Sequence, residues 1–258
     1  MAILCYHSID PRWESPLAIA PQAFDRQCSW LARHRRVVDL DQATRLVDSG
    51  GRLPRGIVAL TFDDGFAALY EHARPILAAH RLPATIFVVA ETLAPAGRRV
   101  DWVESWDNPP ASPLRTLTLD QILEMQEAGI TFGSHSYSHH DLTLLGEAEC
   151  ERDLRQSREL LESQLGRPVP FLAFPRGRHN ERVRRAAERA GFTHAFSLPE
   201  VPEPVSPYAL PRVCALPSLG LRVLGIKTSW WYPRLRTTPM YSALRHVARR
   251  ATGGDVHG

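Results

Sequence analysis

The sequence lacks the long apolar run, of about 18 residues, that a membrane-spanning helix needs. Its four cysteines are widely spaced and form no C-x-x-C pair, so we expect neither a disulfide framework nor a thiolate metal site. Aromatic residues make up only 8% of the chain, and glycine and proline are near ordinary usage, which excludes collagen-like and low-complexity classes. The N-terminus shows no secretory signal pattern, and we therefore expect a cytoplasmic protein.

What the chain does have is length and apolar content. Its 258 residues are 44% hydrophobic, enough to bury a sizeable core. The formal net charge of +3 is too small to indicate a nucleic-acid partner, and we expect none. The excess of positive charge lies beyond residue 221, where seven lysines and arginines face one acid, Asp255.

The basic segment also carries apolar residues at helical spacing: Met240, Tyr241, Leu244 and Val247. Such a segment could lie on the anionic inner face of a membrane, but a basic end of this kind is more often a solvated helix or a frayed terminus. We expect one domain over residues 1–220 and a basic appendage, 221–258, that is not an independent domain.

Short apolar runs alternate with helical patterns along the chain. Strands are predicted at 3–6, 57–62, 84–89, 130–134, 169–174 and 194–197 and near Val213; helices are predicted at 21–34, 66–80, 118–129, 147–165 and 180–191. This alternation favours a parallel α/β sheet with helical crossovers. Periodicity alone does not decide whether the sheet closes into a barrel.

The segment Thr61-Phe62-Asp63-Asp64-Gly65 lies where an apolar strand ends and a helix begins. Catalytic side chains of βα architectures gather at this end of the strands. Adjacent carboxylates on a strand point to opposite faces, but a turn at Gly65 can direct both to one site. A helix N-cap is the alternative role for either aspartate.

A second polar segment, His135-Ser136-Tyr137-Ser138-His139, follows another predicted strand. Two imidazoles four residues apart can bind one cation, and Asp141 offers an acceptor that would orient one of them. Together with a carboxylate from the first segment they form a plausible set of metal ligands, although a lone histidine is more often structural.

These two segments resemble the T-F-D-D-G and H-S/T-x-x-H motifs of the polysaccharide deacetylases of carbohydrate esterase family 4. The resemblance covers roughly residues 1–215 and implies a distorted (β/α)7 barrel. It further implies that Asp64, His135 and His139 bind a divalent metal ion, usually zinc, with cobalt, nickel and manganese as alternatives, and that Asp63 is the general base.

The third family motif is matched in part by Phe174-Pro175-Arg176-Gly177. The resemblance assigns Pro175 and Arg176 to the oxyanion and substrate site, where the backbone N–H of Arg176 would be the donor. The arginine that usually opens this motif is replaced by Ala173, so we assign the orientation of Asp63 to Arg212. An exposed surface arginine is the alternative reading of Arg212.

The leucine-x-histidine motif that usually supplies the general acid is absent. His7, at the end of the first strand, takes that role in our reading, as in the circularly permuted branch typified by biofilm poly-N-acetylglucosamine deacetylases; a structural histidine is the alternative. Trp102 and Trp106, on a long loop, either stack on a sugar ring or pin the loop to the barrel. His179 is expected at a solvated surface position.

The resemblance implies a hydrolase that removes an N-acetyl group from an amino sugar by means of metal-activated water. The substrate is an oligosaccharide or polysaccharide, or a lipid-linked or nucleotide-linked sugar; the missing export signal favours the last two. One alternative is that the same metal site acts on a non-sugar amide or a cyclic imide, and another is a carbohydrate-binding pseudoenzyme. The sequence indicates neither the metal nor the oligomeric state.

Overall fold

The computed structural model describes residues 1–50, 55–103, 114–199, 203–217 and 219–229 and positions 231, 232, 235 and 238. The strands are β1 (Ala2–Tyr6), β2 (Ser8–Ile9), β3 (Ala18–Ile19), β4 (Arg36–Val37), β5 (Ile57–Phe62), β6 (Thr85–Val88), β7 (Thr131–Ser134), β8 (Phe171–Ala173), β9 (His194–Ser197), β10 (Leu210–Pro211) and β11 (Val213–Cys214). The helices are α1 (Pro21–His34), α2 (Leu40–Gly50), α3 (Arg74–His80), α4 (Leu119–Glu127), α5 (Glu147–Leu165), α6 (Glu181–Arg189) and α7 (Leu221–Lys227), with the π-helix η1 (Leu69–Ala73) and the 3-10 helices η2 (Ala90–Thr92) and η4 (Pro175–Gly177).

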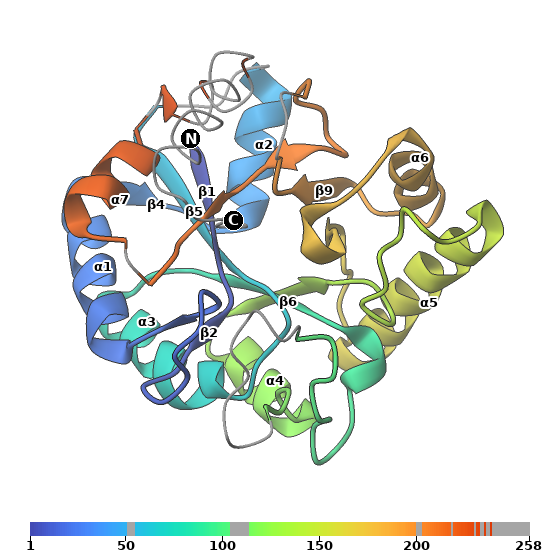
Figure 1. The fold of residues 1–258 in the computed structure, drawn as a ribbon, viewed down its shortest axis with the longest axis horizontal. Coiled ribbons are helices and arrows are strands. Elements are labelled where there is room, and N and C mark those ends of the chain that lie inside the picture. The colour runs from blue at the N-terminus through green and yellow to red at the C-terminus, as the bar shows by residue number, and fades with distance from the viewer. Residues whose placement is uncertain are drawn as a thin grey trace, which may run out of the picture.

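The main sheet runs in the order β10-β9-β8-β7-β6-β5-β1-β11, and its described pairings are all parallel. Strands β10 and β11 lie at opposite edges, yet only Arg212 separates them in the chain. The chain therefore crosses from one edge of the sheet to the other at Arg212, and the sheet nearly closes into a barrel surrounded by helices (Figure 1). The predicted distorted barrel is confirmed, with β1 as the first strand of the chain.

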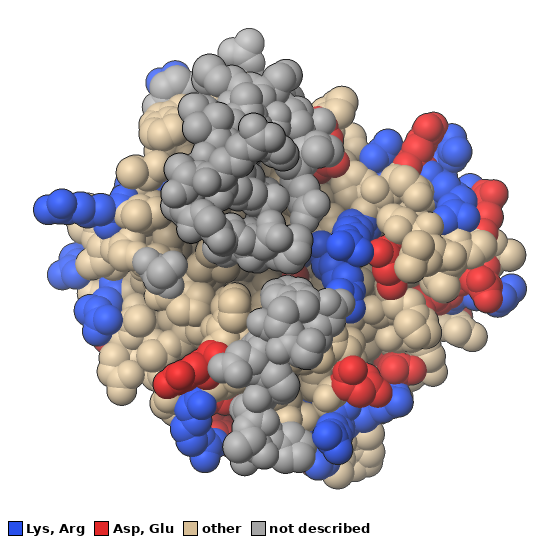
Figure 2. All heavy atoms as spheres, in the orientation of Figure 1, with Lys and Arg blue, Asp and Glu red and all other residues tan. Residues whose placement is uncertain are grey.

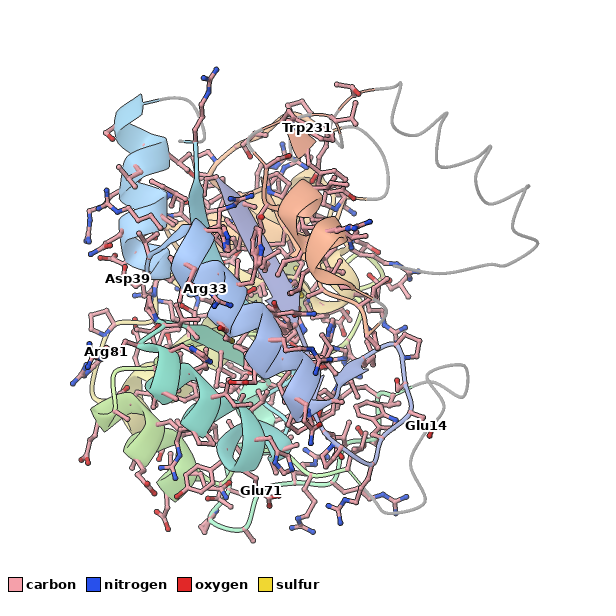
Figure 3. All side chains as sticks on the ribbon, turned by 90° about the vertical axis from the view of Figure 1, so that its left-hand side faces the viewer. Glu14, Arg33, Asp39, Glu71, Arg81 and Trp231 are labelled. Atoms are coloured by element: carbon pink, nitrogen blue, oxygen red, sulfur yellow. The ribbon has the colours of Figure 1, made fainter. Side chains whose placement is uncertain are left out.

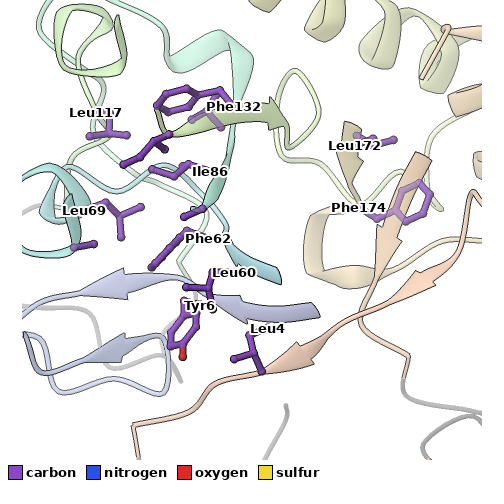
Figure 4. Packing of buried hydrophobic residues seen from close by; sticks show 14 of the residues in the cluster. Leu4, Tyr6, Leu60, Phe62, Leu69, Ile86, Leu117, Phe132, Leu172 and Phe174 are labelled. Carbon is purple, nitrogen blue, oxygen red and sulfur yellow. The ribbon is translucent and has the colours of Figure 1, made fainter. Parts of the chain in front are cut away.

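Alternate residues of each strand face two different cores. Met1, Ile3, Ala59, Phe87 and Phe196 belong to a cluster inside the barrel. Their neighbours in sequence pack outward against the helices; Figure 4 shows part of that layer, with Leu4, Tyr6, Leu60, Phe62 and Ile86 among its members. This period of two explains why the strands read as continuous apolar runs, because both faces are buried.

Helix α2, which the sequence analysis did not predict, covers the inner core near the starts of the strands. Its Leu40 and Ala43 join the same cluster as Met1 and Ile57. The carboxyl ends of the strands lie at the other end of the barrel. Since the inward positions of β1 and β5 are Cys5 and Thr61, which are paired in register, the next inward positions are His7 and Asp63.

Two predicted helix starts are confirmed. Thr118 and Gln121 form a capping box at α4, and the Asn180 side chain accepts from Val183 N at the start of α6. Helix α7 was not predicted, and it falls within the expected appendage. It packs beside α1 (Figure 3), where Arg35 donates to Gly225 O at 3.1 Å. No helix in the described part of the chain is both long and apolar enough to span a membrane.

Paired charges cover α5 and α6. Arg189 contacts both Glu147 and Glu151, and Arg155 contacts Glu151 as well. Acidic and basic side chains are interspersed along this rim of the molecule (Figure 2). Exposed pairs of this kind contribute little to stability individually.

We predict that Gly133→Ala destabilises the barrel. A methyl group there would lie 2.6 Å from two ring atoms of Phe87 and 3.1 Å from Phe171 O, inside the narrow core. Overpacking of this kind costs about 1–3 kcal/mol, measurable by urea unfolding. Gly220→Ala is the control, because its methyl group meets nothing within 4 Å. An equal loss of unfolding free energy in both variants would contradict this account.

Candidate metal centre and active site

The aspartate pair follows β5 at a left-handed turn. Asp64 has a φ of 68° and Gly65 one of 63°, whereas Asp63 continues the alternation of the strand. A Cβ on Gly65 would lie 2.8 Å from Val88 Cγ1, so glycine is required there by space as well as by conformation. The turn directs Asp64 toward the histidine segment, and both carboxylates are buried.

The two histidines converge on Asp64. His139 Nε2 lies 3.2 Å and His135 Nε2 3.7 Å from Asp64 Oδ1. His135 Nδ1 contacts Ala173 O at 2.8 Å, and since a carbonyl only accepts, this nitrogen carries the proton. Burial lowers the pKa of His135 to about 4, so the ring is neutral at pH 7 and its Nε2 lone pair faces the aspartate.

The conformation of the histidine segment is fixed by hydrogen bonds to Asp153 of α5 and by one hydrogen bond within the segment. Asp153 accepts from Tyr137 N at 2.8 Å and from Ser138 Oγ at 2.7 Å, and Ser136 Oγ accepts from His139 N at 2.9 Å. Asp153 was not predicted as a site residue from the sequence. A signal was present, because Asp153 is an acidic residue next to Leu154 on the apolar face of the predicted helix.

Asp141 does not orient a histidine, contrary to the expectation. Its carboxylate accepts from Thr143 N at 3.0 Å and from Arg178 Nη1 at 3.1 Å. Within the turn of residues 141–144, the Asp141 carboxylate accepts from the nearby backbone. Aspartate side chains often form such local hydrogen bonds in place of more distant ones. The acceptor for His135 is a backbone carbonyl instead.

The donor set at Asp64 fits a divalent cation. One carboxylate oxygen and two imidazole nitrogens lie within 4.8 Å of one another, and all three residues are buried. A neutral imidazole and a carboxylate without a proton between them have lone pairs facing each other, which a cation would satisfy. Two nitrogens and one oxygen also match the ligands that catalytic zinc sites use, with positions left open.

Asp63 has a different partner. Arg212 donates to both of its oxygens, at 2.6 and 2.8 Å, and the guanidinium is fully buried with Phe87 5.5 Å away. Burial raises the pKa of Asp63, but the Arg212 charge outweighs that effect and holds the pKa well below its usual range. The reading of Arg212 as an exposed surface residue is therefore wrong.

His7 and Cys5 complete the surroundings of Asp63. Cys5 Sγ donates to Asp63 Oδ2 at 3.3 Å, and one His7 ring nitrogen lies within 4.8 Å of both groups. The spacing of Cys5, His7 and Asp63 would suit a second cation. The Arg212 guanidinium, however, already donates to both Asp63 oxygens, and its positive charge would repel a cation there. His7 is half-buried and directly follows β1. Like Cys5, two residues earlier, it occupies an inward position.

Of the other predicted site residues, Pro175 and Arg176 lie in η4, which Phe174 separates from Ala173, the residue whose carbonyl orients His135. Arg176 has a φ of 58° and is exposed. Trp102 lies at the site, with its indole Nε1 donating to Asp64 Oδ1 at 3.0 Å. Trp106 lies outside the described residues.

His179 is not at a solvated surface position, so that prediction is wrong. Its side chain is 5% exposed, and Nε2 lies 2.9 Å from Glu203 Oε2. The partner comes from a segment more than twenty residues away in the chain, which local polarity cannot reveal. Phe174, whose ring centroid is 4.9 Å from that of His179, completes the enclosure.

Comparison with known proteins matches this chain to polysaccharide deacetylases. A family model described as polysaccharide deacetylase matches residues 50–195. The poly-beta-1,6-N-acetyl-D-glucosamine N-deacetylase of Staphylococcus aureus (strain MRSA252) is 25% identical over 209 residues, 76% of this chain and 67% of that protein. Protein YxkH of Bacillus subtilis (strain 168) is 25% identical over 193 residues, 74% of this chain and 62% of YxkH, so the chain spans less than two thirds of that relative.

Solved structures share the fold. The Streptococcus pyogenes deacetylase PplD in complex with acetate aligns with a TM-score of 0.72 at 24% identity, over 89% of this chain and 98% of that one. IcaB from Ammonifex degensii aligns with a TM-score of 0.69 at 24% identity, over 92% and 97% of the two chains. At this identity the likeness establishes the barrel and no more.

Arg212→Met is predicted to destabilise the protein strongly, because it leaves Asp63 buried without a counter-charge. Removing one partner of a buried pair costs about 3–5 kcal/mol, to be measured by urea unfolding. Arg178→Met is the control, since Arg178 pairs with Asp141 at a side chain that is 58% exposed. Exposed pairs contribute up to about 1 kcal/mol. The account is wrong if the two variants lose the same stability.

Proposed function

The chain belongs to the polysaccharide deacetylase family, whose model matches more than half of it, and on that premise we propose that it is a metal-dependent hydrolase that removes N-acetyl groups from amino sugars. One observation carries the proposal. A buried cation-ligand set of two imidazoles and a carboxylate lies beside a second buried carboxylate, Asp63, which takes no part in it.

Each group has a distinct role in the proposed reaction. When bound at Asp64, His135 and His139, a divalent cation supplies Lewis acidity, which makes a water more acidic and polarises the acetyl carbonyl. Asp63 accepts the proton of the attacking water. Because Arg212 keeps Asp63 ionised, the carboxylate can accept that proton throughout the neutral range.

The remaining roles concern the oxyanion and the leaving amine. The backbone N–H of Arg176 is the proposed donor to the oxyanion, since η4 follows the strand whose Ala173 contacts His135. His7, with a ring nitrogen within 4.8 Å of an Asp63 oxygen, is the proposed acid that protonates the amine as the C–N bond breaks.

For the substrate, we propose an N-acetylated amino sugar in an oligomeric, lipid-linked or nucleotide-linked form. The name of the Staphylococcus aureus relative supports a β-1,6-linked N-acetylglucosamine oligomer as the first compound to test. A cytoplasmic location stays a prediction. So does membrane contact by the basic segment, because Met240 to Val247 lie outside the described residues.

The first test joins metal content with acetate release. The purified chain, loaded with Zn²⁺, should bind about one equivalent and release acetate from at least one member of a panel of oligomeric, lipid-linked and nucleotide-linked N-acetyl sugars. Hydrolysis confined to a cyclic imide added to the panel would transfer the site to the non-sugar alternative. Failure to bind any divalent metal would favour a carbohydrate-binding pseudoenzyme.

Asp63→Asn should keep the metal and lose turnover by about 10²–10⁴-fold, the usual contribution of a general base. Asp64→Asn should lose the metal itself, because it removes the only carboxylate of the ligand set. Asp141→Asn is the matched control, expected to keep both properties since Asp141 bonds to Thr143 and Arg178. Wild-type turnover in Asp63→Asn would remove Asp63 as the base.

His7→Ala should slow the deacetylation of an N-acetyl sugar by about 10²–10⁴-fold without changing metal content. An activated aryl acetate offers a sharper comparison, because its leaving group departs without protonation. We expect its hydrolysis to be affected far less by the same change. Equal losses on the amide and on the ester would show that His7 is not the acid.

A further inference from the structure

The long connection between β6 and α4 is attached to the turn that carries Asp64. Leu117 N donates to Gly65 O and Ala67 N donates to Arg115 O, both at 2.8 Å. The two arms of the connection also pair with each other, through Val100 N to Leu114 O at 2.9 Å. Its described ends are therefore fixed to the backbone that follows the aspartate pair.

Trp102 extends from this ribbon onto two of the candidate metal ligands. Its Nε1 donates to Asp64 Oδ1 at 3.0 Å, and its ring stacks on His139 with centroids 4.9 Å apart and planes 28° apart. Beside it, Trp13 and Phe66 form part of a small apolar cluster that packs against Trp102. The indole of Trp102 thus packs against this apolar cluster and also contacts Asp64 and His139.

The two histidines differ in what orients them. His135 is fixed by its Nδ1 contact with Ala173 O at 2.8 Å. His139 Nδ1 is buried and has no hydrogen-bond partner within the described part of the chain. A metal-binding imidazole is ordinarily oriented by a hydrogen bond from its other nitrogen. For His139, stacking on Trp102 is the contact that takes the place of that bond.

We propose that Trp102 is a positioning residue that sets the affinity of the Asp64, His135 and His139 cluster for its cation. It fixes the carboxylate through the indole N–H and the imidazole through the ring face. The proposal rests on the metal site of the proposed function. It differs from sugar stacking, one of the two roles considered from the sequence, because the N–H and one ring face are occupied by the protein itself.

The test measures metal binding directly. Chelator-treated full-length protein is titrated with Zn²⁺ against a chromophoric competitor, for the wild type and for Trp102→Phe. The phenyl ring can still stack but cannot donate, so we expect the Kd for Zn²⁺ to rise by about 10–100-fold, the usual effect of losing a group that orients a ligand. Trp102→Ala, which loses both contacts, should bind more weakly still.

A spectroscopic readout separates this role from a general loss of structure. Co²⁺ quenches indole emission at short range, so its binding should quench wild-type fluorescence by an increment that Trp102→Phe lacks while the Co²⁺ absorption bands persist. Trp231→Phe is the matched control, because Trp231 is 42% exposed and belongs to the α7 region. It should keep the wild-type Kd and the wild-type increment.

Two results would overturn the proposal: a wild-type Kd for Zn²⁺ in Trp102→Phe, or an unchanged quenching increment. Both are distinguishable from failure of the proposed function, which would appear as absent metal binding in the wild type or as unaltered binding in Asp64→Asn. If Trp102→Phe does not fold, as judged by circular dichroism of the metal-free protein, the Zn²⁺ titration of Trp102→Ala and the difference in Co²⁺ quenching between the wild type and Trp102→Ala decide.

Discussion

The buried ion pair of Arg212 and Asp63 links the closure of the barrel to the candidate site. Arg212 is the residue between β10 and β11, where the chain passes from one edge of the sheet to the other. Its guanidinium is fully buried, and such a charge is tolerated only with a well-placed partner. Arg212 reaches Asp63 from the point where edge strands β10 and β11 come together. The ion pair therefore forms only when the two edges of the sheet are near each other, as they are in the nearly closed barrel.

Backbone strain is concentrated around the same site. Of the five described non-glycine residues with positive φ, Arg81 ends α3, where a left-handed residue is ordinary. The other four, Asp64, Ser136, His139 and Arg176, lie in the three segments that form the site. Each costs of order 1–3 kcal/mol and persists only where surrounding contacts determine the conformation. Hydrogen bonds from α5 supply those contacts for the histidine segment.

The sequence predicted those helices and strands whose defining residues lie close together in the chain. The bounds 21–34, 57–62, 147–165 and 194–197 agree with the structure, because the signals that define them are local: apolar patterning within each element and, for α5, the C-cap glycine Gly166 directly after it. The orientation of Asp63 by Arg212 was assigned through the family resemblance rather than from a local pattern. The contacts of Asp153 and His179 were missed, because their partners lie at least 15 residues away in the chain. Helix α2 was missed although its signal is local, because Leu40, Ala43 and Val47 recur at the spacing of one helix face.

Asp63 and Asp64 show how neighbouring, chemically identical side chains acquire different chemistry. Asp63 follows the strand alternation into the barrel, where the protein supplies its counter-charge through Arg212. Asp64 is turned out of that alternation by a positive φ and meets two imidazoles, neither of which carries a permanent charge as a guanidinium does. Burial without a permanent counter-charge suits Asp64 to the proposed role of cation ligand. Burial with a counter-charge leaves Asp63 ionised, which is the state that its proposed role as general base requires.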